Sequence, residues 1–202
     1  MATITADQVK QLRDKTGAGM MECKAALAEA NGNLEEATTL LRKRGLAQAA
    51  KRAGRATAQG LIGSYIHMGG KIGVLVEVNC ETDFVARTPE FQTLAKEIAM
   101  HIAAMSPLVV KREDLTPELI EKEREIYRAQ FAGQNKPANV IDKIVDGKLE
   151  SYYSQVCLLD QPFARDPNMT IKQMVTAATA KTGENVTITR FVRFKLGETA
   201  EG

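Results

Sequence analysis

One short stretch of the sequence combines residue types that suit contact with a partner at a protein surface. It runs Cys80-Glu81-Thr82-Asp83-Phe84-Val85-Ala86-Arg87 and places an acid beside an aromatic ring. A predicted strand precedes it, and Thr88-Pro89-Glu90 follows with a capping residue and a proline typical of a helix start. A loop held at both ends presents its side chains rigidly. Two interpretations stay open from the residues alone: Phe84 contacts a partner, or Phe84 folds into the core while Asp83 bonds the loop backbone.

The residues that usually carry covalent catalysis are not arranged for it. His67 and His101 lie in different predicted elements, and no serine or cysteine has the Gly-x-Ser-x-Gly setting of an activated nucleophile. We interpret Gly17-Ala18-Gly19 as a helix end and cap, because a dinucleotide loop needs a preceding strand and a third glycine. The cysteines have no metal-ligand spacing and are expected to be reduced and mostly buried: Cys23, Cys80 and Cys157. The sequence therefore predicts no enzyme, no metal site and no cofactor.

The composition favours an ordinary globular protein over a membrane-spanning or secreted one. Of 202 residues, 44% are hydrophobic and 26% are charged, which is close to the average for globular proteins. No apolar stretch approaches the ~20 residues that span a bilayer, and the N-terminus lacks the basic start and apolar core of a secretion signal. We therefore expect a cytoplasmic protein without a membrane segment.

Positive charge concentrates locally although the net charge is only +2. The cluster consists of Arg42, Lys43, Arg44, Lys51, Arg52 and Arg55. No aromatic residues interleave with it to stack bases, so a solvated linker is favoured and no direct nucleic-acid binding is expected. The alternative function is an RNA- or ribosome-associated binding module, whose affinity would fall steeply with salt.

The first 45 residues have the pattern of three short helices. Thr5 and Gln8 form a capping box for the first helix, which should end at Gly17. A second helix is predicted from Met20, and a third is predicted between Asn33 and Gly45. We predict a helical bundle over residues 1–45, a basic connector, helical or flexible, over 46–60, and a core domain over 61–202.

The remaining chain alternates strand and helix patterns. Period-two spacing predicts strands from Leu61 and over 72–78, joined by a two-residue turn at Gly69-Gly70. It also predicts a third strand, in which one face carries Val186, Ile188, Arg190, Val192 and Phe194. Helix starts are predicted at Thr88, Thr116, Pro137 and Thr170, and the middle two helices should form a projecting hairpin. The predicted fold class is α+β, with an antiparallel three-stranded sheet and helices.

The sequence resembles the elongation factor Ts family over nearly its whole length. The resemblance rests on two long motifs and a tail. The first motif is Leu12-Arg13-Asp14-Lys15-Thr16-Gly17-Ala18-Gly19-Met20-Met21-Glu22-Cys23-Lys24-Ala25-Ala26-Leu27, and the second is Val76-Glu77-Val78-Asn79-Cys80-Glu81-Thr82-Asp83-Phe84-Val85-Ala86. The tail consists of Gln161-Pro162-Phe163, Gly183-Glu184-Asn185 and Arg190-Phe191.

The resemblance implies a fold, a function and a partner. It implies a bundle like the ubiquitin-associated domain, an α+β core, and guanine-nucleotide exchange on elongation factor Tu in its GDP form. In this family the Thr-Asp-Phe-Val stretch inserts between helices of the partner's GTPase domain and helps dislodge its Mg²⁺. That role passes here to Thr82, Asp83, Phe84 and Val85, and a second partner surface passes to Arg13, Met20, Met21 and Lys24.

The chain differs from longer members of the family because the hairpin and the Asp83-Phe84 stretch occur once. Short members resemble half of the longer core and restore it by pairing two chains. We therefore expect a two-fold homodimer through the sheet-bearing region, which would form a heterotetramer with two partner molecules.

Overall fold

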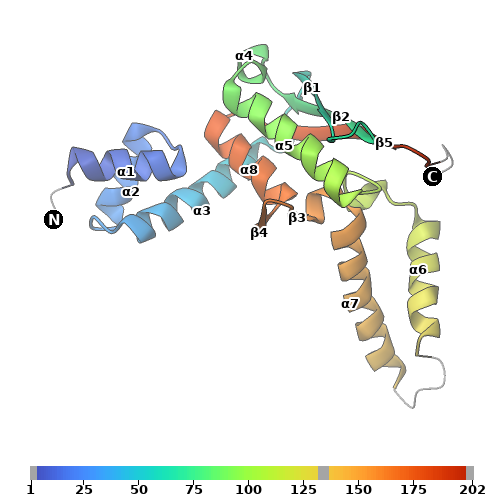
Figure 1. Cartoon of the computed structure of the whole chain (residues 1–202). Coiled ribbons are helices and arrows are strands. Elements are labelled where there is room, and N and C mark those ends of the chain that lie inside the picture. The colour runs from blue at the N-terminus through green and yellow to red at the C-terminus, as the bar shows by residue number, and fades with distance from the viewer. Residues whose placement is uncertain (1–3, 132–136, 199–202) are drawn as a thin grey trace.

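The computed structural model describes residues 4–131 and 137–198 of the chain. A helical bundle lies beside an α+β core, and a pair of helices projects away from the core (Figure 1). The α+β class, the antiparallel three-stranded sheet and the projecting hairpin are therefore confirmed. None of the described helices is both long enough and apolar enough to cross a bilayer.

The bundle follows from its caps and its apolar spacing. Helix α1 (Ala6–Thr16) begins with the predicted capping box at Thr5 and ends at Gly17, whose φ of 69° suits glycine. Helix α2 (Met20–Glu29) and the first half of α3 (Leu34–Arg52) pack on α1. The core of this bundle is small, and its fully buried residues are Leu12, Cys23, Ala26, Leu27 and Ala37.

Helix α3 (Leu34–Arg52) does not end at Gly45, so that prediction is wrong. The helix continues and carries the chain from the bundle to the core, where it packs on α8 (Ile171–Thr182). A β-carbon on Gly45 would lie 3.0 Å from the Ala180 β-carbon. The glycine therefore allows close helix packing rather than ending the helix, and the predicted connector is helical up to Arg52 and not helical over 53–60.

The sheet consists of β1 (Gln59–Ile66), β2 (Ile72–Cys80) and β5 (Thr187–Lys195), in the order β1-β2-β5 with both pairs antiparallel. Both Gly69 and Gly70 have positive φ, as predicted for the turn. The loop is longer than the predicted two residues, because the His67 backbone N–H donates to the Ile72 carbonyl across residues 68–71.

A bulge in β5 corrects the predicted third strand. The pairing with β2 shifts between Glu77 and Val78, which leaves Thr189 as an extra residue. Ile188, before the bulge, is buried, but the side chains beyond it change face. The prediction that Ile188 shares its face with two later residues is therefore wrong, since both of these are exposed: Val192 and Phe194.

Helices cover one face of the sheet. Helix α5 (Pro89–Met105), capped by Thr88 as predicted, packs on β1 and β2. Gly63 permits this approach, since a β-carbon there would lie 3.0 Å from the Ala95 carbonyl oxygen. Helix α8 ends at Gly183 as predicted and packs on α5 near the two-stranded sheet of β3 (Pro162–Phe163) and β4 (Asp166–Thr170). Beneath α5, Val74, Val76 and Val78 are buried.

The projecting pair is α6 (Pro117–Ala129) and α7 (Ala138–Val156) (Figure 1). Ion pairs cross between the two helices, from Arg124 to Asp146 at 2.9 Å and from Arg128 to Asp142 at 3.3 Å. Exposed pairs of this kind contribute little stability each. Near the middle of α7, Val145 and Leu149 supply buried apolar surface.

Candidate functional site

The Thr82–Val85 segment forms a single helical turn rather than an open loop. Helix α4 (Asp83–Ala86) begins at Thr82, whose hydroxyl accepts a hydrogen bond from the Val85 backbone N–H at 3.4 Å. Val85 is half-buried against the core, and Ala86 is buried. Two of the predicted site residues, Thr82 and Val85, therefore fix the segment rather than face outward.

The other two residues of the segment point to solvent. Phe84 is 78% exposed, so the interpretation that it fills the core is wrong. The Asp83 carboxylate is half-exposed and forms an ion pair with Arg87 at 2.8 Å, one helical turn away. The segment thus presents an aromatic ring beside an acid, at the end of the core near the start of α5 (Figure 1).

A carboxylate from a distant part of the chain clamps this turn. Glu184 accepts hydrogen bonds through Oε2 from the backbone N–H groups of Glu81 at 3.1 Å and Thr82 at 3.0 Å. Its Oε1 accepts from the Thr82 hydroxyl at 2.6 Å. Hydrogen bonds to an ionised acceptor are stronger than neutral ones. Glu184 is a site residue that the sequence does not predict, and its only signal there is the Gly183-Glu184-Asn185 motif.

A second set of bonds ties the same region to the end of the bundle's long helix. The Asn185 backbone N–H donates to Glu81 Oε1 at 2.7 Å, and this bond lowers the pKa of the Glu81 carboxyl. The Asn185 side chain donates to the Arg55 carbonyl at 2.8 Å, while Arg55 Nη1 donates to Glu81 Oε2 at 3.4 Å. Glu81, Asn185 and Arg55 therefore connect the clamp to the segment that follows α3.

Cys80 lies directly under the clamp and is fully buried. Its thiol donates to the Thr82 carbonyl at 3.1 Å, and burial raises its pKa. A protonated, buried thiol is a poor nucleophile. All three cysteines are free and buried, as predicted, and we assign Cys80 a packing role.

The second predicted surface lies on the bundle. Met20 is 55% exposed and Met21 is 75% exposed, so neither fills the bundle core. Lys24, one turn further along α2, is exposed, and so is Arg13 on α1. Among the described residues no bond links this surface to the Thr82–Val85 segment, and Figure 1 shows the bundle to one side of the core with α4 above α5.

Little in the described parts of the chain suits metal or covalent chemistry. Over residues 4–131 and 137–198, no group of three or more His, Cys, Asp or Glu side chains is placed to hold a metal ion. His101 is buried, its Nε2 lies 2.9 Å from Gln161 Oε1, and its Nδ1 accepts from the Ala164 backbone N–H at 3.2 Å. The basic cluster lies along α3 and, at Arg55, just beyond it. Within the cluster, Arg44 forms an ion pair with Glu29.

The chain is similar to known proteins over almost its entire length. The family model described as Elongation factor TS matches residues 2–198. The chain belongs to this family. It is 62% identical to the elongation factor Ts of Fervidobacterium nodosum, across 96% of this chain and 99% of that protein. It is 58% identical to that of Thermosipho melanesiensis, across 96% of this chain and 100% of the relative.

Other elongation factor Ts relatives have slightly longer chains. The protein of Carboxydothermus hydrogenoformans is 58% identical, with 96% of this chain and 90% of the relative aligned. The segment from Thr82 and the bundle surface with Met20 both lie within the part matched by the family model. The chain therefore aligns with nearly the whole length of the Fervidobacterium nodosum and Thermosipho melanesiensis proteins.

Proposed function

We propose that the chain is a guanine-nucleotide exchange factor that binds elongation factor Tu in its GDP form and promotes GDP release. The observation that carries the proposal is the exposed Phe84 ring on a turn clamped by Glu184. Exposing a phenylalanine forgoes the roughly 1.5–3 kcal/mol that burial of its side chain provides. An aromatic residue held rigidly outside the core is suited to fill a pocket on a partner.

The mechanism needs no covalent step in this chain. Phe84 inserts between helices of the partner's GTPase domain and buries its ring there, while Asp83 exchanges its bond to Arg87 for polar groups of the partner. Mg²⁺ requires near-ideal octahedral geometry and bridges the nucleotide phosphates, so a small shift of its surroundings weakens GDP binding sharply. Because coupling between two ligands is reciprocal, nucleotide binding in turn weakens the affinity of the partner for this chain.

The bundle surface provides a second contact in this proposal. Met20 and Met21 present flexible thioether side chains that adapt to an irregular apolar surface. Lys24 places a positive charge one helical turn from them on α2, and Arg13 contributes a positive charge on α1. This surface would hold the partner, while the Thr82–Val85 segment acts on the nucleotide site.

We further propose that two copies of the chain pair through the open face of the sheet. On that face Ile66 aligns with Phe194 across Gly73, and Leu75 aligns with Val192. Ile66 and Phe194 are 68% and 67% exposed. A contiguous exposed apolar face on a single sheet marks an association surface. A homodimer would present two Thr82–Val85 segments and bind two partner molecules.

Pairing through the sheet predicts that Phe194→Glu produces a monomer. The new charge would be buried without a partner in the interface, which is strongly unfavourable. Light scattering should give twice the chain mass for the parent protein and the single-chain mass for the variant. Ile126→Glu, which changes an exposed side chain on α6, is the matched control and should stay dimeric. A monomeric parent protein, or a dimeric Phe194→Glu, would contradict the pairing.

The exchange proposal is tested with elongation factor Tu loaded with fluorescent GDP. The purified chain, added in catalytic amount with excess unlabelled nucleotide, should accelerate loss of fluorescence. GDP release that proceeds at the intrinsic rate of the partner at every concentration of the chain would overturn the proposal.

A further inference from the structure

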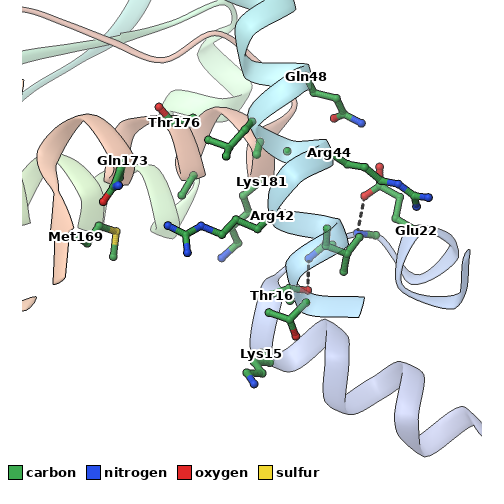
Figure 2. A pocket seen from close by; sticks show the side chains of 18 of the residues that line it. Lys15, Thr16, Glu22, Arg42, Arg44, Gln48, Met169, Gln173, Thr176 and Lys181 are labelled. Carbon is green, nitrogen blue, oxygen red and sulfur yellow. Dashed lines mark hydrogen bonds between the residues drawn. The ribbon is translucent and has the colours of Figure 1, made fainter. Parts of the chain in front are cut away.

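A cavity of about 510 Å³ lies at the joint between the bundle and the core, away from the Thr82–Val85 segment. Its walls are the turn between α1 and α2, the middle of α3, and β4 with α8 (Figure 2). Pockets that hold small molecules usually measure roughly 300–1,000 Å³ and often lie between domains. The exchange function proposed above does not use this cavity.

The walls touch at two points, which makes the cavity a defined feature of the joint. A β-carbon on Gly17 would lie 3.1 Å from Lys181 Cε, so the Lys181 side chain reaches from α8 to the end of α1. The close approach of Gly45 to Ala180 forms the second point. Molecules that enter the cavity would therefore contact the bundle and the core together.

Positive groups exceed negative ones in the lining. The basic residues are Lys15, Arg42, Arg44 and Lys181, and Figure 2 shows Arg42 extending from α3 toward Met169. In the described parts of the chain, Lys15 and Arg42 have no ion-pair partner, while Lys181 Nζ lies 4.0 Å from a Glu90 oxygen. Unpaired cations in the wall of a cavity attract anions.

The acidic lining residues are already engaged within their own turns. Glu22 Oε2 accepts from the Gly19 backbone N–H at 3.2 Å, which closes the cap of α2. Asp166 Oδ1 accepts from the Asn168 backbone N–H at 3.2 Å. These carboxylates bond backbone groups, and among the described residues Lys15 and Arg42 are the lining cations left to a ligand.

The uncharged part of the lining combines threonine, asparagine and glutamine side chains with aliphatic groups. Met169, Ala177 and Ala180 contribute apolar surface on the core side, and Leu46 contributes it on α3. None of the described lining residues is aromatic. An apolar or planar part of a ligand would rest on these aliphatic groups while its charged part meets the cations.

We infer that this cavity binds a phosphate-bearing small molecule of about mononucleotide size. Its phosphate lies among Lys15, Arg42 and Lys181, and its uncharged part lies against Met169 and Ala177. Arg42 suits this role because its planar guanidinium can donate two parallel hydrogen bonds to phosphate oxygens. A ligand in this position joins α1, α3 and α8 and restricts movement of the bundle against the core.

The inference is tested by titrating the ¹⁵N-labelled full chain, without partner, with ADP, adenosine and pyrophosphate in separate experiments. Backbone amide signals of Gly17, Gly19 and Gly45 report on the cavity, and Gly70 and Gly147 report on distant surfaces. ADP should shift the first three signals and leave the last two unchanged. Adenosine should bind at least about tenfold more weakly than ADP, since it lacks the charged hydrogen bonds. Weaker binding of pyrophosphate would show that the uncharged part contributes.

Two matched variants complete the test. Arg42→Gln should weaken ADP binding by about tenfold, the loss expected for a charged hydrogen bond. Lys43→Gln removes an exposed charge outside the cavity and should change binding by less than about twofold. Equal losses in the two variants, or no shift at Gly17 and Gly45 at millimolar ADP, would overturn the inference. Tighter binding of an acidic peptide than of ADP, dependent on Arg42, would also overturn it.

Discussion

The two surfaces that we propose for the partner are built in different ways. The Thr82–Val85 segment is packed on the main core and clamped by Glu184 from the turn after α8. Met20 and Met21 lie on a short helix of a small bundle that has its own separate core. A clamped ring can act only in one orientation, whereas flexible methionines adapt to the surface they meet. The first surface suits a specific action on a partner, and the second suits attachment.

This difference also predicts how each surface responds to mutation. Loss of the Phe84 ring, or of the Glu184 clamp that orients it, should remove most of the stimulated GDP release. Loss of one methionine among several adaptable contacts should be tolerated, because most interface residues contribute less than about 1 kcal/mol each.

The largest effect is expected for Phe84→Ala. Removing the ring should reduce stimulated GDP release by about 10- to 100-fold, which corresponds to the loss of a buried aromatic anchor. Stopped-flow fluorescence with GDP-loaded partner measures this rate. Met68→Ala, which truncates a side chain that is 88% exposed on the hairpin loop, serves as the control and should release GDP at the parent rate.

Asp83→Ala should have a smaller effect than Phe84→Ala, because the carboxylate is already paired with Arg87. Both variants should unfold at the parent temperature, since both side chains point outward. Release by the two variants at the parent rate would contradict the role of the segment.

The next largest effect on stimulated GDP release is expected for Glu184→Gln. The substitution keeps the size of the side chain but removes the negative charge that accepts bonds from Glu81 and Thr82. We expect about tenfold slower stimulated release and a loss of about 1–3 kcal/mol in the free energy of unfolding. Glu125→Gln, an exposed position on α6, is the control. Unchanged stability and exchange in Glu184→Gln would show that the clamp does not position the segment.

Met20→Ala and Met21→Ala should each slow exchange by less than about fivefold. The loss should come from weaker partner binding, so a higher concentration of the chain should restore the rate. Titration of the chain in the release assay separates these cases. Slower GDP release that persists at a saturating concentration of the chain would show that the methionines act in the release step. It would remove the contrast between the two surfaces.

The smallest effect concerns a buried polar network found in the core. Burial lowers the pKa of His101, so the folded core keeps this imidazole neutral, while the unfolded chain binds a proton near pH 6.5. Stability should therefore fall as pH drops below about 6.5, by at most about 1.4 kcal/mol per pH unit. Urea unfolding at pH 7.5 and 5.5 measures this change, and His101→Gln should remove that part of it. A parent protein whose stability is the same at both pH values would contradict the prediction.

Much of the fold could be predicted because the ends of its helices are determined by local sequence. The caps at Thr5, Thr88 and Thr170 and the end at Gly183 each depend on a few neighbouring residues, and all are confirmed. The alternation in β2 likewise predicted its buried valines, because one face of that strand meets α5.

The rest depends on contacts between distant segments. The sequence predicts a helix end at Gly45, but α3 continues through the good helix formers over 46–52, and the packing of Gly45 against Ala180 cannot be read from the local sequence. The bulge at Thr189 exists only relative to β2. For the candidate site, the sequence indicated Asp83 and Phe84 but left the position of the ring open, and the clamp by Glu184 joins residues about a hundred positions apart.

The central claim is that Glu184 acts through the orientation of Phe84, and a double-variant cycle tests it most directly. Stimulated GDP release is measured for Phe84→Ala, Glu184→Gln and the double variant under identical conditions. If the clamp serves the ring, the double variant should be no slower than Phe84→Ala alone, because a missing ring cannot be misplaced. Losses that multiply in the double variant would show that the two residues act independently and would contradict the account.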